Sequence, residues 1–278
     1  MIKKEIEVLG TVFTISLPNK YSFLFSKLFD ELQRIEQKYT RFDSSSYLMN
    51  LNSHLFKKQN IDSETYFLLK FAEDMKKFTD GYFSIDQKNR LEVYGYGLTV
   101  NSSKSNIFSN FFSRNYFLFS SSIVLFKQIE IGGFGKGYAL LKLKEFLDSQ
   151  YVKEYELNAG GDIYVKGKSK IYLESPYYQE NVFAYVFLKN TSLCSSSPSR
   201  RNFNSKHHLI NPKLKDSNSD LIQVFIQEEN PMKCDALSTA LFVMGFEKAV
   251  SFSKKHNLLV LLITTNDMYS SINITYIN

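Results

Sequence analysis

The feature that most constrains this chain is a glycine-rich stretch that runs from Glu130 to Ala139. An apolar run over residues 123–126 precedes it, and apolar residues at helical spacing follow it over residues 140–147. This order predicts a strand, a tight turn and a helix. A helix that opens from a glycine turn directs free N–H groups and the positive end of its dipole towards whatever binds there, usually an anion. The stretch matches neither a P-loop, which needs Ser or Thr where Tyr138 stands, nor the G-x-G-x-x-G dinucleotide fingerprint. A glycine turn without a ligand therefore stays open as an alternative.

Helical and strand patterns are mixed along the chain without a regular β–α–β alternation, which predicts an α+β fold. Amphipathic spacing predicts long helices in three segments. Ser46 is predicted to cap a further short helix, and Ser63 is predicted to cap the second of the long helices. The predicted long helices cover residues 24–39, 63–79 and 235–252. Strands are predicted over residues 5–17, 152–157, 163–165, 182–188, 221–226, 258–263 and 271–277, with several more within 91–127 and a polar loop over 195–205. Because neither an internal repeat nor a long linker is visible, we expect one domain over residues 1–278.

Composition excludes several classes of function. The formal net charge of +6 is mild for 278 residues and forms no dense Lys/Arg stripe, so nucleic acid is not an expected partner. Cys194 and Cys234 form no zinc pattern, and we expect two free thiols, although one disulfide stays possible. The longest apolar run, residues 258–263, is too short to span a bilayer. Since Glu5 and Glu7 interrupt the place of a signal peptide, we expect a cytoplasmic protein.

Three further clusters carry residues suited to chemistry. Asp235 and Thr239 are four apart, so a helix would place both oxygens on one face, where they suit a hard cation such as Mg²⁺. The alternative is that Asp235 caps its own helix and Thr239 packs. His208 follows another histidine close to Pro212 and could act as a general base, although paired histidines are often inert. The segment 158–162 holds two glycines, which permit positive φ or a close backbone approach, or form an ordinary hairpin turn.

Together these segments resemble, in order, the motifs of the ApbE-type FAD:protein FMN transferases, which are flavin transferases. The resemblance covers nearly the whole chain and rests on seven motifs. They are residues 9–11 for M-G-T, 41–42 with 46–52 for an aromatic residue followed by S-E-I-S-R-L-N, 79–84 for T-D-G-A-F-D, 130–139 for D-L-G-G-I-A-K-G-Y-A, 158–162 for N-x-G-G-D, 208–212 for H-I-I-D-P and 235–239 for D-A-L-A-T.

The resemblance implies an α+β, T-fold-like flavin transferase domain in which mixed strands pack against helices. Family members bind FAD and a divalent metal, usually Mg²⁺, and transfer FMN onto a Ser or Thr hydroxyl of an acceptor protein with release of AMP. By position, His208 would be the base, and four residues would belong to the metal site: Gly133 through its carbonyl, Asp235, Ser238 and Thr239. The implied FAD-binding residues are Leu9, Phe42, Tyr82, Phe83, Ser84, Glu130, Lys136 and Ile210.

The chain departs from the family pattern at a few of these positions. Leu9 replaces Met, Ser84 and Glu130 each replace Asp, Asn211 replaces the Asp of H-x-x-D-P, and residues 194–196 read Cys-Ser-Ser instead of T-S-G. These changes bear on FAD affinity and on the choice of acceptor. The alternatives to a transferase are an FAD pyrophosphatase, a catalytically silent FAD-binding protein, and a protein that binds another nucleotide at the glycine turn.

Overall fold

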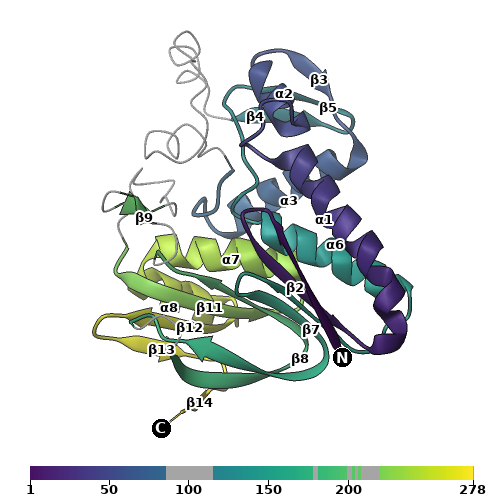
Figure 1. Cartoon of the computed structure of the whole chain (residues 1–278). Coiled ribbons are helices and arrows are strands. Elements are labelled where there is room, and N and C mark those ends of the chain that lie inside the picture. Colours follow the sequence, from purple (N-terminus) through teal and green to yellow (C-terminus); the bar gives the residue numbers. More distant parts are fainter. Residues whose placement is uncertain (86–114, 178–180, 199–201, 204–205, 208–218, 278) are drawn as a thin grey trace.

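One long antiparallel sheet forms the base of the molecule (Figure 1). The computed structural model describes residues 1–85, 115–177, 181–198, 202–203, 206–207 and 219–277. The strand order is β1-β2-β6-β7-β8-β11-β12-β13, and β14 pairs with β8. Its strands are β1 (Ile2–Val8), β2 (Thr11–Leu17), β6 (Tyr155–Ala159), β7 (Asp162–Glu174), β8 (Val182–Ser196), β11 (Leu221–Glu228), β12 (Leu259–Thr264), β13 (Met268–Ser270) and β14 (Thr275–Tyr276). All of the pairings in this sheet are antiparallel, as is typical of an α+β fold, and the predicted class is confirmed.

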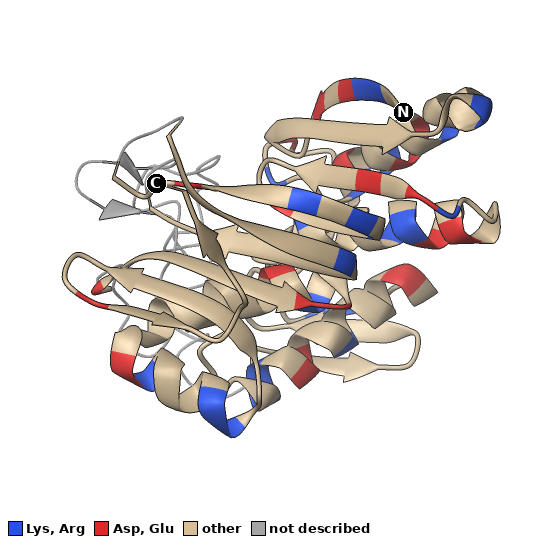
Figure 2. Ribbon diagram, turned by 90° about the horizontal axis from the view of Figure 1, so that it is seen from below, with Lys and Arg blue, Asp and Glu red and all other residues tan. Residues whose placement is uncertain are grey.

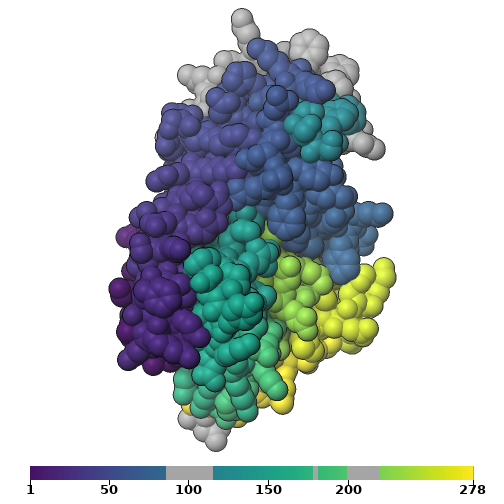
Figure 3. Space-filling model, turned by 90° about the vertical axis from the view of Figure 1, so that its right-hand side faces the viewer, coloured from purple at the N-terminus to yellow at the C-terminus, as the bar shows by residue number. Residues whose placement is uncertain are grey.

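Helices cover one face of this sheet, with α6 and α7 next to it, α1 along β1, and α3 farther from the sheet (Figure 1). The helical elements are η1 (Asn19–Leu24), α1 (Phe25–Tyr39), α2 (Tyr47–Ser53), α3 (Ser63–Phe78), α6 (Gly135–Ser149), α7 (Pro231–Met244) and α8 (Phe246–Lys255). In the space-filling view, α6 in teal comes to the surface between α1 and α7 (Figure 3). The main hydrophobic core lies between these helices and the sheet and draws buried residues from Val8 through Leu262. The helix of the glycine-rich segment is therefore held on several sides.

The other face of the sheet has a second core. The long hairpin of β7 and β8 has a register shift between Val165 and Lys168, and its outer half packs Ile171 and Val186 into an apolar cluster with Phe225 and other residues of β11 and β12. Seen from below, the strands lie in front, with Lys and Arg interspersed among Asp and Glu (Figure 2). In the described part of the chain, every helix is too short or too polar to cross a bilayer.

Two smaller sheets complete the described residues. β3 (Lys58–Asn60), β5 (Ser122–Leu125) and β4 (Tyr116–Phe119) form a three-stranded antiparallel sheet, and β9 (Asn202–Phe203) pairs with β10 (Lys206–His207). β4 and β5 account for the end of the strand-rich region predicted over residues 91–127. The rest of that prediction, up to residue 114, lies outside the described residues.

The structure corrects four details of the prediction. The helix predicted over 235–252 is two helices, because Gly245 adopts φ 79° between α7 and α8. Asp62, and not Ser63, caps α3 by accepting from the N–H of Thr65 at 2.8 Å. Phe67, whose apolar side chain fits the helical spacing predicted to line one side of the helix over residues 63–79, is exposed on α3. Finally, β8 continues through Ser196, so the predicted polar loop begins later.

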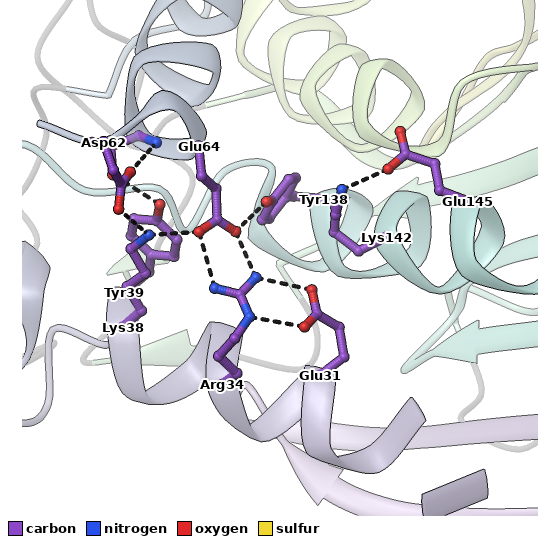
Figure 4. A network of polar contacts seen from close by, with 10 residues as sticks. Glu31, Arg34, Lys38, Tyr39, Asp62, Glu64, Tyr138, Lys142 and Glu145 are labelled. Atoms are coloured by element: carbon purple, nitrogen blue, oxygen red, sulfur yellow. Dashed lines mark hydrogen bonds and ion pairs between the residues drawn. The ribbon is translucent and has the colours of Figure 1, made fainter. Parts of the chain in front are cut away.

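A polar network joins α1, α3 and α6 around the carboxylate of Glu64 (Figure 4). Both of its oxygens accept from Arg34, at 2.6 and 2.9 Å, and one also accepts from Lys38 at 2.6 Å. The hydroxyl of Tyr138, in the first turns of α6, donates to the same carboxylate. Burial raises the pKa of Glu64, but the hydrogen bonds from Arg34, Lys38 and Tyr138 outweigh it and lower that pKa to about 2. The network thus ties the start of α6 to two neighbouring helices.

This lowered pKa predicts a pH-dependent stability. Because the pKa of Glu64 falls from 4.5 to about 2 on folding, its contribution is complete above pH 4.5 and is lost as the pH falls towards 2. At pH 7 we expect Glu64→Gln to lower the free energy of unfolding by about 1–2 kcal/mol, allowing for solvent screening. Urea unfolding at pH 7 and at pH 3 measures this difference, which should shrink at pH 3. Glu73→Gln, on the same helix with only a 4.0 Å contact to Lys70, is the control and should change little. A difference that stays constant with pH would contradict the assignment.

Candidate active site at the start of helix α6

Helix α6 begins without a cap of its own. Phe134 occupies the N-cap position, makes no side-chain cap hydrogen bond, and no acidic residue lies in the first turn. The free N–H groups of such a turn need an acceptor from elsewhere. That acceptor is Asp235 of α7, whose Oδ2 accepts from the N–H of Gly137 at 2.8 Å. A carboxylate from a second helix therefore lies at the positive end of the α6 dipole.

The structure contradicts one of the two roles predicted for Asp235. Asn230 caps α7, because its Oδ1 accepts from the N–H groups of Met232 at 2.9 Å and Lys233 at 3.1 Å. The alternative that Asp235 caps its own helix is wrong. Asp235 lies one turn inside α7, is only 4% exposed, and serves the neighbouring helix.

The close approach of α6 and α7 depends on Gly137. A Cβ at this position would lie 2.5 Å from the carbonyl oxygen of Pro231, 2.7 Å from the Cβ of Asp235 and 2.9 Å from the Cα of Met232. Two of these three atoms belong to the backbone of α7, so they could move away only if the helix itself shifted. Glycine at this position is therefore what allows the carboxylate of Asp235 to reach the first turn of α6.

Substitution of Gly137 is expected to destabilise the protein. Gly137→Ala should lower the free energy of unfolding by about 1–3 kcal/mol, since it inserts a methyl group into a closely packed crossing. Gly135→Ala is the matched control on the same turn, because its Cβ would meet Ile131 only at 3.9 Å. We expect this control to be neutral or to gain up to about 1 kcal/mol from helix propensity. Denaturant unfolding of both variants measures the contrast, and equal effects would contradict this account of the crossing.

Lys136 is paired with Asp162, the first residue of β7. The ammonium of Lys136 donates to Oδ2 of Asp162. The Lys136 side chain is 23% exposed, whereas that of Asp162 is 1% exposed. Burial lowers the pKa of Lys136, but the charges of Asp162 and of Asp235 raise it by more, so the net shift is upward. Lys136 is therefore charged and paired with Asp162, with the charge of Asp235 also acting on it.

The hairpin turn between β6 and β7 places Asp162. Gly160 and Gly161 both adopt positive φ, 63° and 103°, and Oδ1 of Asn158 accepts from the N–H of Gly161 at 2.9 Å. A Cβ on Gly160 would lie 2.0 Å from Oγ1 of Thr11, so the turn presses against β2. The segment is thus a hairpin turn. It also needs the positive φ and the close backbone approach that glycine permits. It sets the carboxylate of Asp162 facing α6.

Ser238 and Thr239 differ in their surroundings. Ser238 is fully buried, and its hydroxyl lies 2.8 Å from that of Ser196 on β8 and donates to the carbonyl of Asp235 at 2.8 Å. Thr239 is half-buried on the turn that follows Asp235. Among the described residues, no three His, Cys, Asp or Glu side chains gather in a way that could hold a metal ion. An oxygen donor set on α7 would therefore contain one carboxylate and a hydroxyl.

The cysteines lie beneath this site. Cys194 and Cys234 are buried free thiols, which confirms the first of the two alternatives for them. The Cys234 thiol donates to the carbonyl of Ile226 at 3.2 Å. Burial raises the pKa of both thiols, so they stay protonated.

The predicted FAD-binding residues lie in varied environments. Glu130, two residues before Gly132, accepts from Arg41 at 2.6 Å with both side chains largely buried. Phe83 is buried, with its ring 5.9 Å from that of Phe134, whereas Tyr82 and Ser84 are half-buried. Phe42 is exposed beneath the guanidinium of Arg41. Leu9 adopts φ 55°, which a side chain rarely tolerates, and its N–H donates to Glu36 at 2.7 Å. Leu9 and Gly10 form the two-residue turn between β1 and β2, and such a hairpin turn requires positive φ at both positions.

Two predicted residues cannot be placed, and two others were missed. His208 and Ile210 lie outside the described residues. Asp162 and Arg41 were not predicted as site residues, although the structure pairs them with Lys136 and Glu130. Both stand inside motifs quoted above, at the end of Asn158–Asp162 and beside Phe42. The sequence signal that could have identified them is their charge, which is opposite to that of Glu130 for Arg41 and opposite to that of Lys136 for Asp162.

Comparisons with known proteins agree on the family and the fold. A family model described as "ApbE family" matches residues 9–262. Among curated proteins, the FAD:protein FMN transferase of Buchnera aphidicola subsp. Baizongia pistaciae is 24% identical over 93% of this chain and 84% of its own length. The FAD:protein FMN transferase of Haemophilus influenzae is 24% identical over 85% of this chain and 77% of its own length. The crystal structure of the ApbE protein from Thermotoga maritima superposes with a TM-score of 0.84 at 22% identity, over 97% of this chain and 96% of that one. The flavin transferase ApbE from Vibrio cholerae gives 0.82 at 18% identity over the same fractions.

Proposed function

Because the chain belongs to the ApbE family, whose model matches residues 9–262, we propose that it is an FAD:protein FMN transferase. In this reaction a Ser or Thr hydroxyl of an acceptor protein attacks the phosphorus of the FMN half of FAD. The pyrophosphate bond breaks, FMN stays on the acceptor as a phosphodiester, and AMP leaves. We also propose that residues 1–278 form one domain and that the protein is cytoplasmic.

The observation that carries the proposal is the contact of Asp235 with Gly137 at the start of α6. At this place the N-terminus of α6, the buried carboxylate of Asp235 and the ammonium of Lys136 lie within one helical turn. The N–H groups and the ammonium suit the anionic pyrophosphate, since both favour negative charge at this place. The carboxylate suits a divalent cation that would accompany the pyrophosphate.

The donor set on α7 fits Mg²⁺, which prefers oxygen ligands and keeps several waters. Asp235 and Thr239 lie four residues apart on one helix, and we assign both as ligands, together with the carbonyl of Gly133. The hydroxyl of Ser238 is bonded to Ser196 and to the Asp235 carbonyl, so it would support the turn that carries the ligands. When bound, the ion would offset negative charge that grows on the pyrophosphate during transfer.

The chain's own residues supply the remaining steps. Lys136 would bind a phosphate oxygen, and His208 would take the proton of the attacking hydroxyl. Glu130, Phe42 and the segment Tyr82-Phe83-Ser84, with Leu9 and Ile210, would orient FAD so that the reacting phosphorus faces the acceptor. Water that replaced the acceptor hydroxyl would give FMN and AMP instead.

Product analysis tests this proposal. The protein is incubated with FAD and Mg²⁺, with and without a candidate acceptor protein, and FAD, FMN and AMP are separated by chromatography. A transferase releases AMP in step with loss of FAD, needs the acceptor, and stops with EDTA. AMP with an equal amount of free FMN in both samples would indicate a pyrophosphatase. FAD that survives unchanged would indicate a silent binding protein.

A further inference from the structure

Asp162 is a buried carboxylate for which the proposed reaction names no role. It is 1% exposed, yet both of its oxygens are engaged. Oδ1 accepts from the N–H of Ser195 on β8 at 3.0 Å, and Oδ2 accepts from the ammonium of Lys136. A charge removed from water in this way is costly unless it is paired. The ammonium of Lys136 supplies that pairing.

The position of Lys136 needs such a partner. Lys136 lies in the first turn of α6, where the positive end of the helix dipole disfavours a cation. A free lysine there would turn its flexible chain towards water. The anion of Asp162, fixed by the β6–β7 hairpin and by Ser195, holds the ammonium over the turn instead.

The ammonium keeps capacity for a ligand while it is held. It has three N–H donors, and one of them serves Asp162. The Lys136 side chain is 23% exposed, in contrast to its buried partner. A phosphate oxygen bound at the first turn of α6 would use the two remaining donors while Asp162 keeps its own.

We infer that Asp162 is a positioning residue that aims the ammonium of Lys136 at the phosphates of the bound flavin nucleotide. This inference rests on the proposed function and adds a residue to it. Asp162 acts through Lys136 and does not touch the ligand. A purely structural role, in which Asp162 only fastens β7 to β8 through Ser195, is the competing explanation.

Two ligands separate these explanations. FAD carries the pyrophosphate, whereas riboflavin has the same ring system and no phosphate. In Asp162→Asn, the amide oxygen can still accept from Ser195, but the anion that holds Lys136 is gone. We expect FAD to bind about tenfold more weakly and riboflavin to bind within about twofold of wild type. Isothermal titration at fixed Mg²⁺ measures both dissociation constants.

Asp148→Asn is the matched control. Asp148 also pairs with two lysines, Lys144 at 3.0 Å and Lys166 at 3.1 Å, but it lies at the far end of α6. This variant should bind both ligands as wild type does. Unchanged FAD binding by Asp162→Asn, or an equal loss for FAD and riboflavin, would overturn the inference. Wild-type protein that binds no FAD would instead overturn the proposed function and the inference together.

A stability measurement tests the pairing without any ligand. Lys136→Met leaves the buried carboxylate of Asp162 without its cation, so the thermal midpoint should fall. Adding Asp162→Asn removes that stranded charge, and the double variant should therefore unfold several degrees higher than Lys136→Met. A double variant that is less stable than Lys136→Met would show that Asp162 holds something other than this lysine.

Discussion

Replacing Asp235 with asparagine is expected to reduce AMP release by about a thousandfold or more. The change removes the negative charge that suits a divalent cation beside the pyrophosphate. The amide oxygen of asparagine can still accept from the N–H of Gly137, so the contact between α6 and α7 survives. We expect the free energy of unfolding to change by no more than about 1 kcal/mol. Initial rates of AMP release, with urea unfolding of the same samples, measure the two effects.

Asn230→Ala provides the control for Asp235→Asn. It removes the cap of the same helix, α7, one turn before Asp235. Loss of an N-cap should cost about 1 kcal/mol of stability and leave the rate within about twofold. The two variants should thus separate activity from stability on one helix. Near-normal AMP release by Asp235→Asn would show that this carboxylate is not a metal ligand.

The second large effect is expected at His208. If this side chain takes the proton of the acceptor hydroxyl, His208→Ala should slow FMN transfer by roughly 10²–10⁴-fold. Binding of FAD should persist, because the proposed role of His208 concerns the acceptor. Single-turnover transfer at saturating FAD measures the rate, and titration of FAD measures the binding.

His207→Ala is the natural control, since it changes the neighbouring histidine of the same segment. We expect it to transfer FMN at close to the wild-type rate. If both variants lost transfer rate equally, the cause would be a disturbed conformation of the segment and not the loss of a base. An unchanged rate in His208→Ala would assign the proton transfer to another group.

Local sequence patterns predicted much of the fold. The helix over residues 24–39 and the cap at Ser46 were predictable, because an amphipathic stripe and an N-cap residue act over a few positions. The prediction took residues 235–252 as one amphipathic helix, but α7 is buried on nearly every side and has no amphipathic stripe of its own. Without that stripe, its end at Gly245 was missed and the next helix was merged with it.

The site was predictable only as a list of residues. The role of Asp235 was ambiguous, because the N–H that it accepts belongs to Gly137, 98 positions away in the chain. The pairing of Lys136 with Asp162 is likewise made by the fold, which brings a helix start and a hairpin turn together. Contacts of this kind need the tertiary structure. The roles of His208 and Ile210 stay predictions from the family resemblance.

Transfer of FMN onto a protein hydroxyl would change the intact mass of the acceptor, which mass spectrometry measures. A candidate acceptor is co-expressed with this protein, beside a second culture in which its target Ser or Thr is replaced by alanine. The account predicts that the unaltered acceptor alone gains the mass of one FMN less one water, and that Asp235→Asn abolishes this gain. An acceptor of unchanged mass, while FAD is converted to free FMN and AMP, would contradict it.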